Sequence, residues 1–368
     1  MTTSVQIPSY PQNNSEYPVP FRFGHRYETA VGQRLAEEGF YIPVDLVVST
    51  SGMLYVMCRS DLFPVGTIPR FRFIPVDIND EYGTPIAPMI DGKPEEPGNE
   101  FLPSPTMCAM DSNGIIFATD EHANVVSMYN TEGETLGLWG QEGTEPGKFS
   151  GPAGITFDAD ENLLITESRN HRVQKFSREG EYLGGWGEFG TKPGQLNHPW
   201  GISCDPINGT ILVADWRNDR VQRFSSSGQV LQIIGKPGLG EGELKRPSGV
   251  AVNNHGDVYI ADRGNNRVLL FNPRGMFIES FRGDANITEK GYRKLLTNPD
   301  ALRLRDNVAN LDVEKRLVAP ISVKVDGKGL VYIVDTGRYR VQIYRNLAKL
   351  LSPDQLDPPE MHADPVIY

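Results

Sequence analysis

The sequence predicts an all-β protein built as a six-bladed β-propeller, and three observations support this prediction. One pattern occurs four times: ITESRNHRVQKF from Ile165, VADWRNDRVQRF from Val213, IADRGNNRVLLF from Ile260 and IVDTGRYRVQIY from Ile333. The prolines that begin successive units are separated by 47, 47 and 48 residues: Pro105, Pro152, Pro199 and Pro247. The 38 glycines and 28 prolines suit short strands joined by tight turns. Such a period is typical of repeats that bury their apolar faces against one another.

Each unit is predicted to hold four strands. The first begins at the proline, the second carries the ILVAD-like run, the third carries the RVQRF-like run, and the fourth ends in a Trp-Gly or Ile-Gly pair. Two more divergent copies begin at Pro43 and Pro105, and the set amounts to six units of four strands. The run Phe21–Gly24 (FRFG) resembles a last strand, so we expect it to complete the sixth blade and close the ring.

The propeller is expected to span residues 21–345, between an N-terminal extension (1–20) and a C-terminal tail (346–368). Two insertions interrupt it. Residues 61–100 are rich in proline and acidic side chains and are predicted to form a long loop in blade 1. Residues 284–317 are predicted to form one or two short helices between blades 5 and 6. Insertions in repeat proteins often lie on the binding face, and surface decoration is the equal alternative.

The composition narrows the functional classes. The formal net charge of -11 argues against nonspecific nucleic-acid binding, so nucleic acid is not an expected partner. The sequence has no run of eighteen apolar residues and no basic, apolar leader, so we expect a cytoplasmic protein that does not span a membrane. Three scattered cysteines favour reduced thiols over a disulfide framework.

A carboxylate and an arginine recur five residues apart in four units. A carboxylate at a strand end pairs across a tight turn with an arginine that follows the turn. Because the pair recurs, we interpret it as scaffold in all four units: Glu167 with Arg172, Asp215 with Arg220, Asp262 with Arg267, and Asp335 with Arg340.

The run Gly264–Val268 (GNNRV) that follows Asp262, together with its copies, resembles the NHL family of repeats. The resemblance covers roughly residues 38–345 and is specific in blades 3 to 5. It implies a six-bladed propeller of the NHL type, which agrees with the closed all-β ring indicated by period and composition.

The candidate site lies where the repeat departs from its own pattern. In this connectivity the start of the innermost strand and the turn after the second strand open on one face, here called the mouth. Two residues after the initial proline, blades 3 to 5 keep glycine, whereas blades 1, 2 and 6 hold Asp45, Met107 and Ser322. The turn is altered in the same blades. Cys58 takes the carboxylate position before Arg59, Val125 takes the arginine position opposite Asp120, and blade 6 adds Arg338 and Tyr339.

Blades 6, 1 and 2 are neighbours in a closed ring, so their polar side chains are expected to converge at one side of the mouth. The candidate catalytic residues are Arg59, Asp45, His122, Asp120 and Tyr339. The alternative is structural, because blades near the chain ends carry ring closure and insertions and often diverge.

Aromatic residues mark the opposite side of the mouth. Trp200 and Trp216, with Arg217, are placed to stack on a ligand, although a packing role explains them equally well. Together with Arg338 and Met107 they form the predicted substrate-binding set.

The amidating-lyase branch of the NHL propellers carries a zinc-binding histidine directly after the initial proline in three blades. The equivalent positions here hold other residues, so that zinc site is not expected: Val44, Thr106, Ala153, Trp200, Ser248 and Ile321. One feature does resemble that branch, because the segment LYVMCRSD places Arg59 where those lyases carry a functional arginine. The cofactor is left unknown, with a structural calcium ion on the propeller axis as an open possibility.

Two functions remain open on the sequence. The first is an enzyme that acts on a small molecule or modified peptide in the central funnel, lyase- or hydrolase-like. In it, Arg59 polarises an oxygen and Asp45 or His122 moves a proton. The second is a non-catalytic NHL scaffold that binds a protein or ligand partner on the same face. The asymmetric mouth and the insertions favour the enzyme, and the fold itself does not choose.

Overall fold

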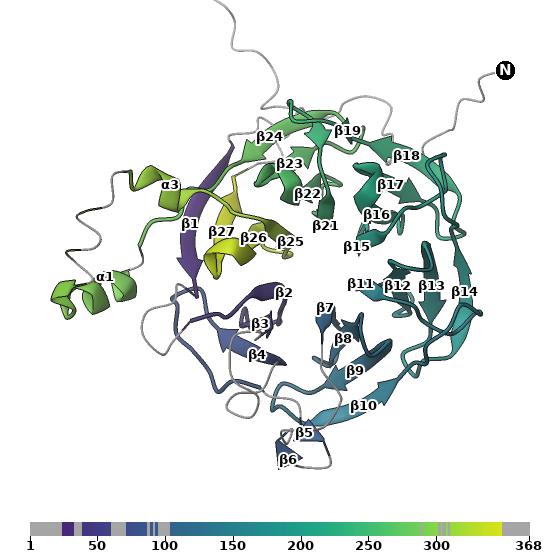
Figure 1. Ribbon diagram of the computed structural model, residues 1–368, viewed down its shortest axis with the longest axis horizontal. Helices are drawn as coiled ribbons and strands as arrows, with labels where there is room; N and C mark the ends of the chain where they lie inside the picture. Colours follow the sequence, from purple (N-terminus) through teal and green to yellow (C-terminus); the bar gives the residue numbers. More distant parts are fainter. Residues whose placement is uncertain are drawn as a thin grey trace, which may run out of the picture.

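Six antiparallel sheets stand as blades around one axis in the computed structural model of the chain (Figure 1). The structure describes residues 24–32, 39–59, 71–86, 89–90, 93–94, 104–287, 289–300, 303, 307 and 310–347. Strands β2, β7, β11, β15, β21 and β25 are innermost, and the predicted six-bladed propeller is confirmed.

The blades follow one another along the chain. Blade 1 holds β2 (Pro43–Val48), β3 (Leu54–Arg59) and β4 (Phe71–Val76), and blade 2 holds β7 (Pro105–Met110), β8 (Ile116–Asp120), β9 (Val125–Tyr129) and β10 (Thr135–Trp139). Blade 3 holds β11 (Pro152–Phe157), β12 (Leu163–Glu167), β13 (Arg172–Phe176) and β14 (Tyr182–Trp186). Blade 4 holds β15 (Pro199–Cys204), β16 (Ile211–Asp215), β17 (Arg220–Phe224) and β18 (Val230–Ile234). Blade 5 holds β21 (Pro247–Val252), β22 (Val258–Asp262), β23 (Arg267–Phe271) and β24 (Phe277–Phe281).

Blade 6 joins the two ends of the propeller. It holds β25 (Pro320–Val325), β26 (Leu330–Asp335), β27 (Arg340–Asn346) and the N-terminal strand β1 (His25–Val31), which pairs antiparallel with β27. Closure by an N-terminal strand is as expected, but the strand begins after the predicted run. Residues 21–23 lie outside the described part of the chain, and Gly24 precedes β1. Ala30 and Val31 at the end of β1 are both fully buried, and Val31 belongs to the apolar cluster between blades 6 and 1.

Blade 1 departs from the predicted four strands and plain loop. The segment 61–100, predicted as a loop, contains β4 and a small hairpin of β5 (Met89–Ile90) and β6 (Lys93–Pro94). Residues 82–86 run beside β4 through isolated bridges, Val76 to Tyr82 and Phe73 to Ile86. This stretch takes the outer place of the blade without forming a continuous strand. Pro75 and Pro85 lack the backbone N–H groups that a full ladder needs.

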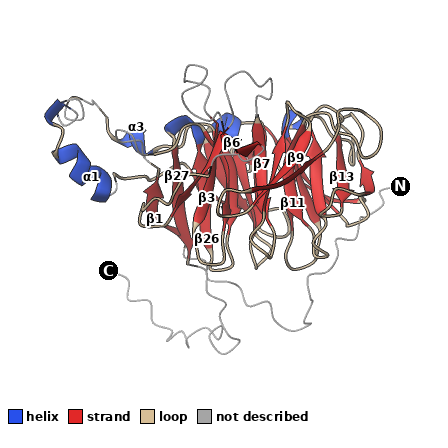
Figure 2. Ribbon diagram, turned by 90° about the horizontal axis from the view of Figure 1, so that it is seen from below, coloured by secondary structure: helices blue, strands red, loops and turns tan. Residues whose placement is uncertain are grey.

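The second insertion is helical, as predicted. It contains α1 (Glu289–Leu296) and α3 (Asp312–Lys315), which lie outside the ring beside β1 (Figures 1 and 2). A short parallel pair, β19 (Lys236–Pro237) with β20 (Glu243–Leu244), precedes blade 5. Among the described helices, none has the length and apolar content required to cross a membrane.

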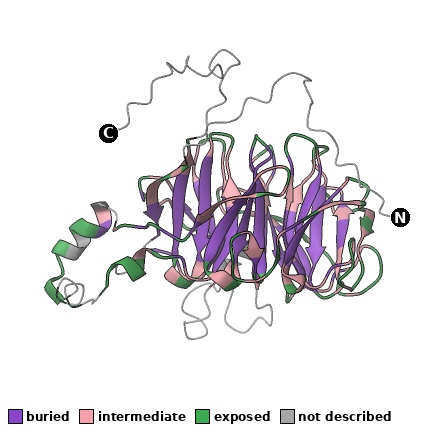
Figure 3. Cartoon of the chain, turned by 90° about the horizontal axis from the view of Figure 1, so that it is seen from above, coloured by how far each residue is buried: buried purple, intermediate pink, exposed green. Residues whose placement is uncertain are grey.

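The core is divided among the blade junctions. A cluster of buried apolar side chains lies between each pair of neighbouring blades, for example Val250 and Leu212 between blades 5 and 4. The inner strands are mostly buried, whereas outermost strands such as β10 and β14 are partly exposed and the connecting loops are largely exposed (Figure 3). Each blade therefore depends on both neighbours for its apolar contacts.

The recurring carboxylate–arginine pairs hold the turns, as predicted. Arg220 Nε lies 2.8 Å from Asp215 Oδ2, and Nη2 donates to the Gln195 carbonyl at 2.9 Å. The other three pairs have the same contact between side chains. Gly201 allows close approach at the axis, because a Cβ there would lie 2.7 Å from the Ser248 carbonyl oxygen.

Candidate functional site

The mouth forms where the innermost strands begin. The initial proline of each strand pairs with the carboxylate position at the end of the second strand, as Pro199 does with Asp215 and Pro247 with Asp262. The residue directly after the carboxylate position therefore lies at the mouth in every blade. We call these six positions the mouth ring: Arg59, Glu121, Ser168, Trp216, Arg263 and Thr336.

Arg59 links blade 1 to blade 2 across the mouth ring. Its Nε donates to the Pro105 carbonyl at 2.6 Å, and its Nη2 lies 3.2 Å from Glu121 Oε1. Thr336 makes the analogous link from blade 6, since its Oγ1 donates to the Pro43 carbonyl at 2.7 Å. The Arg59 side chain is 21% exposed, so its guanidinium is held in place and still reaches solvent.

Arg263 is the functional candidate that the sequence reasoning missed. It begins the 3₁₀ turn η2 (Arg263–Asn265) and makes no side-chain hydrogen bond or ion pair within the described ranges. Partial burial and the positive charge of Arg59 lower the pKa of Arg263. Two guanidiniums from blades 5 and 1 therefore face the same mouth, while Glu121 supplies the single carboxylate of the mouth ring.

The tryptophans Trp200 and Trp216 lie close together, and their role in stacking on a ligand stays a prediction because Trp200 also packs against the core between blades 2 and 3. The ring centroids of the two tryptophans are 6.1 Å apart. Arg246 stacks over Trp216 at 4.5 Å and Arg217 lies over the same ring at 5.6 Å. The indole Nε1 of Trp200 is buried without a hydrogen-bond partner in the described chain.

Asp45 does not join Arg59, contrary to the expected convergence. Its side chain is fully buried, and Oδ1 accepts a hydrogen bond from Ser322 Oγ at 2.5 Å. Oδ2 accepts from the Cys108 backbone N–H at 2.9 Å and lies 3.0 Å from Lys324 Nζ. Asp45 thus ties blade 1 to blades 6 and 2 below the mouth. Asp45 and Ser322, which both replace the glycine of blades 3 to 5, are hydrogen-bonded to each other there.

Met107 is also withdrawn from the mouth. Its side chain is 3% exposed and packs with Phe117 and Ile155 between blades 2 and 3. The predicted contact of Met107 with a substrate therefore has no exposed surface to support it.

The altered turn of blade 2 is satisfied by the backbone. The Asp120 carboxylate accepts N–H bonds from Ser104, His122 and Ala123 at 2.6, 2.9 and 2.8 Å. These donors replace the missing arginine, and burial raises the pKa of Asp120. The His122 side chain is exposed on the turn beside it.

The two candidate residues of blade 6, Arg338 and Tyr339, have different surroundings. Arg338 Nη1 lies 2.6 Å from Glu314 Oε2, and Nη2 donates to the Val313 carbonyl at 3.1 Å. The helical insertion therefore holds Arg338 away from the mouth ring. Tyr339 is 37% exposed and has a positive φ of 54°.

No group of three or more His, Cys, Asp or Glu side chains within the described ranges is arranged to hold a metal ion. Calcium on the axis stays an untested prediction. Near the axis, the Lys324 ammonium already supplies a positive charge to Asp45.

The fold places this protein in the class of six-bladed β-propellers, and two family models match parts of the chain. The sequence model of the NHL repeat matches residues 244–271, and that of the SMP-30/gluconolactonase/LRE-like region matches residues 109–239. No curated protein matches the chain. The similarity to amidating lyases stays a prediction.

Several solved structures share the fold at low sequence identity. A catalytically inactive virginiamycin B lyase from Staphylococcus aureus with quinupristin is 13% identical, with 85% of this chain and 82% of that chain covered and a TM-score of 0.50. A streptogramin B lyase is 15% identical, with 88% and 98% covered and a TM-score of 0.52. A protein of unknown function from Bacteroides thetaiotaomicron is 15% identical, with 88% and 76% covered and a TM-score of 0.57. At this identity the likeness concerns the fold alone.

Proposed function

We propose that the mouth binds a small organic anion or carbonyl compound with an aromatic portion, and that this binding serves a lyase- or hydrolase-like reaction. The observation that carries the proposal is the pair Arg59 and Arg263, which brings two guanidiniums to a mouth ring with one carboxylate. Arginine recognises carboxylate and carbonyl oxygens through directed, charge-assisted hydrogen bonds. In a protein with a net charge of -11, this local excess of positive charge favours an anionic ligand group.

The aromatic portion of the ligand is expected at Trp200 and Trp216. These rings form an apolar wall at the mouth, and Arg246 and Arg217 lie over Trp216. A flat ring on the ligand gains stacking contacts with such a wall.

Glu121 is the candidate proton acceptor. Its Oε1 accepts hydrogen bonds from Arg59 and, at 3.4 Å, from Ser104 Oγ, while its Oε2 has no partner within the described chain. In an elimination, Oε2 takes a proton from the α carbon beside a carbonyl group, and the C–H electron pair moves toward the carbonyl oxygen to give an enolate. The guanidiniums of Arg59 and Arg263 stabilise the developing negative charge. The electron pair then returns to form a C=C bond between the α and β carbons as the leaving group departs from the β carbon with its bonding pair.

The non-catalytic scaffold is the second candidate function. It is favoured by apolar side chains that stand exposed on the outer strands of blades 2 and 3, where Leu138 is 54% and Leu183 is 50% exposed. A protein partner bound there would use the outside of the ring instead of its mouth.

The binding part is tested with phenylacetate and its neutral analogue benzyl alcohol in thermal-shift and calorimetric titrations. Wild type is expected to bind phenylacetate more tightly, and Arg263→Met is expected to weaken that binding by roughly tenfold or more. Arg169→Met is the matched control, because Arg169 is exposed in the corresponding turn of blade 3. Equal affinity of both variants and wild type for phenylacetate would overturn the assignment of Arg263.

The catalytic part is tested by screening, for elimination, aryl carbonyl compounds that carry a leaving group on the β carbon. Glu121→Gln is expected to retain phenylacetate binding and to lose turnover by about 10²-fold or more. If phenylacetate binds and no compound is turned over, the scaffold or simple binding function replaces the enzyme.

A further inference from the structure

A second hollow opens on the face opposite the mouth. It has a volume of about 420 Å³ and is lined by the far ends of β2, β7, β11 and β25, with the turns that follow β2 and β25. A hollow of about 270 Å³ continues it along β15 and β21, and both share Thr156, Lys324 and Asp326. We call this space the rear funnel. Its size is that of a small-ligand site.

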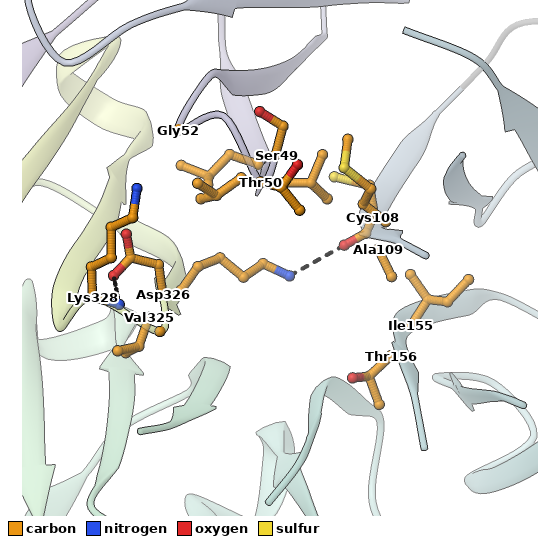
Figure 4. A pocket seen from close by; sticks show the side chains of 16 residues that line it. Ser49, Thr50, Gly52, Cys108, Ala109, Ile155, Thr156, Val325, Asp326 and Lys328 are labelled. Atoms are coloured by element: carbon orange, nitrogen blue, oxygen red, sulfur yellow. Dashed lines mark hydrogen bonds between the residues drawn. The ribbon is translucent and has the colours of Figure 1, made fainter. Parts of the chain in front are cut away.

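Lys324 lies at the floor of the rear funnel. Its side chain extends from β25 and donates to the Cys108 carbonyl of blade 2 at 3.2 Å, one of the interactions dashed in Figure 4. Its Nζ also lies 3.0 Å from Asp45 Oδ2. An ammonium group has three N–H donors. Two have partners, and the third has none within the described chain, although the side chain is 26% exposed.

The charges around the floor balance. Lys324 is compensated by the fully buried Asp45, and Lys328 and Asp326 on the rim carry opposite charges. Burial and the charge of Asp45 raise the pKa of the Cys108 thiol, which stays neutral. Burial, the largest single influence, lowers the pKa of Lys324, but the contacts with Asp45 and Cys108 together outweigh burial and raise that pKa, so the ammonium stays protonated. The rear funnel therefore has no net charge to attract an ion.

The polar groups of the rear funnel that have no partner within the described chain include hydrogen-bond donors: one N–H of Lys324 and two threonine hydroxyls. The Asp326 carboxylate is occupied, because it accepts from the backbone N–H groups of Lys328 and Leu330 and from the Tyr332 hydroxyl. The hydroxyls of Thr50 and Thr156 have no partner within the described chain. Both line the space in Figure 4.

The walls between these polar groups are apolar. Val48, Met110, Ile155 and Val325 contribute aliphatic surface to the lining. A ligand that fits must combine an aliphatic body with an oxygen that accepts the free N–H of Lys324.

We infer that the rear funnel is a second binding site, which takes a small uncharged molecule with a carbonyl oxygen on an aliphatic body. The carbonyl oxygen accepts hydrogen bonds from Lys324 Nζ at the floor and from the Thr156 hydroxyl, while the aliphatic body contacts Met110, Ile155 and Val325. This site is independent of the proposed function at the mouth.

The test uses three probes of similar shape: cyclohexanone, methylenecyclohexane and cyclohexanecarboxylate. The full-length protein is labelled with ¹³C at the methionine methyl groups, and the Met110 signal, assigned with Met110→Leu, is followed by NMR. Cyclohexanone is expected to shift the Met110 signal saturably and to bind at least roughly tenfold more tightly than methylenecyclohexane, which lacks the acceptor. Equal binding of the hydrocarbon would show a merely apolar hollow, and tighter binding of the carboxylate would show an anion site. Either result, or the absence of saturable shifts, overturns the inference.

Variants test whether Lys324 itself provides the hydrogen bond to the ligand. The double variant Lys324→Met/Asp45→Asn removes both charges together, so that no unpaired carboxylate is left buried. It is expected to lose the preference for cyclohexanone over methylenecyclohexane. Thr156→Val provides a second variant outside the ion pair. It is expected to weaken the binding of cyclohexanone about threefold or more, because the ligand loses one hydrogen bond. Lys328→Met is the control on the exposed rim and should leave both affinities unchanged. An undiminished cyclohexanone preference in Lys324→Met/Asp45→Asn and in Thr156→Val would contradict the proposed contacts.

Discussion

Tyr339 has a left-handed backbone conformation that bulky residues seldom adopt, with φ of 54°. The equivalent positions of blades 2 to 5 hold Asn124, His171, Asp219 and Asn266, also at positive φ. Each of these four side chains accepts the backbone N–H of the residue before the next initial proline, at 2.8, 3.1, 2.7 and 2.8 Å. Tyr339 cannot reproduce this bond, and the Ile42 N–H across that junction has no acceptor within the described ranges.

Replacing Tyr339 by asparagine should therefore stabilise the protein. Tyr339→Asn supplies a side-chain acceptor for Ile42 and a residue that tolerates the left-handed region. We expect the free energy of unfolding to rise by about 1 kcal/mol, measured by urea denaturation. The reverse change at the matched position, Asn266→Tyr, should lower it by a similar amount. A Tyr339→Asn variant that is no more stable than wild type would show that the sixth junction is not built like the other four.

Comparing single residues shows which parts of the site the repeat pattern could indicate and which it could not. Asp45 and Ser322 were singled out because they replace glycine, and the structure uses both to satisfy each other below the mouth. Arg263 was overlooked because blade 5 keeps its glycine and its Asp262–Arg267 pair. Aligning the residue after each carboxylate position would have exposed Arg263 as the second arginine of the mouth ring. No sequence pattern indicates Lys324, because its contacts are with Asp45 of blade 1 and Cys108 of blade 2, and its own blade is blade 6.

At the scale of elements, the junction between blades 3 and 4 differs from its neighbours in using histidine. His171 Nδ1 accepts the His198 backbone N–H at 3.1 Å, and the two imidazole rings lie 4.9 Å apart. Burial lowers the pKa of His171, and burial with the charge of Arg217 lowers the pKa of His198. Protonation of His171 at Nδ1 would remove the acceptor that holds the junction.

This junction should make folding stability depend on pH. Because both pKa values are lower in the folded protein than in the unfolded chain, the folded state binds fewer protons in this range. The stabilisation is therefore complete above the unfolded value of about 6.5 and is lost as the pH falls toward the folded values. His171→Asn, which keeps an acceptor at this position, should reduce the loss of unfolding free energy between pH 7 and pH 5. The exposed His255→Asn is the control. Identical pH profiles for wild type and His171→Asn would refute the role of this junction.

The sequence predicts elements well where the repeat is regular and less well where another part of the chain completes a blade. Blades 3 to 5 were predicted strand by strand because their apolar alternation and turns recur. The N-terminal strand is predicted at residues 21–24, of which 21–23 lie outside the described part of the chain, and the described strand β1 runs from His25 to Val31. Its place depends on pairing with β27, some 300 residues away, and not on its local pattern. Strand β4 was missed because Pro75 and the surrounding turn residues resemble a loop.

At the scale of the whole molecule, ring closure distinguishes this protein from an open array of repeats. An open solenoid can unfold repeat by repeat from its ends. Here β1 pairs with β27, and apolar clusters join blade 6 to blade 1 as well as every other pair of neighbours. No blade is free to unfold without exposing the apolar faces of two others.

The closed ring should therefore unfold as one cooperative unit. Val31 of β1 is fully buried with Phe40 and Val341 at the closing junction. Val31→Ala should lower the free energy of unfolding by roughly 1.5–3 kcal/mol through lost burial and a small cavity. All four tryptophans lie in blades 2 to 4, away from this junction: Trp139, Trp186, Trp200 and Trp216. Tryptophan fluorescence and far-UV circular dichroism should then report the same lowered midpoint in the variant. If the fluorescence midpoint stays at its wild-type value while the dichroism midpoint falls, the closing junction melts separately and the ring is not a single cooperative unit.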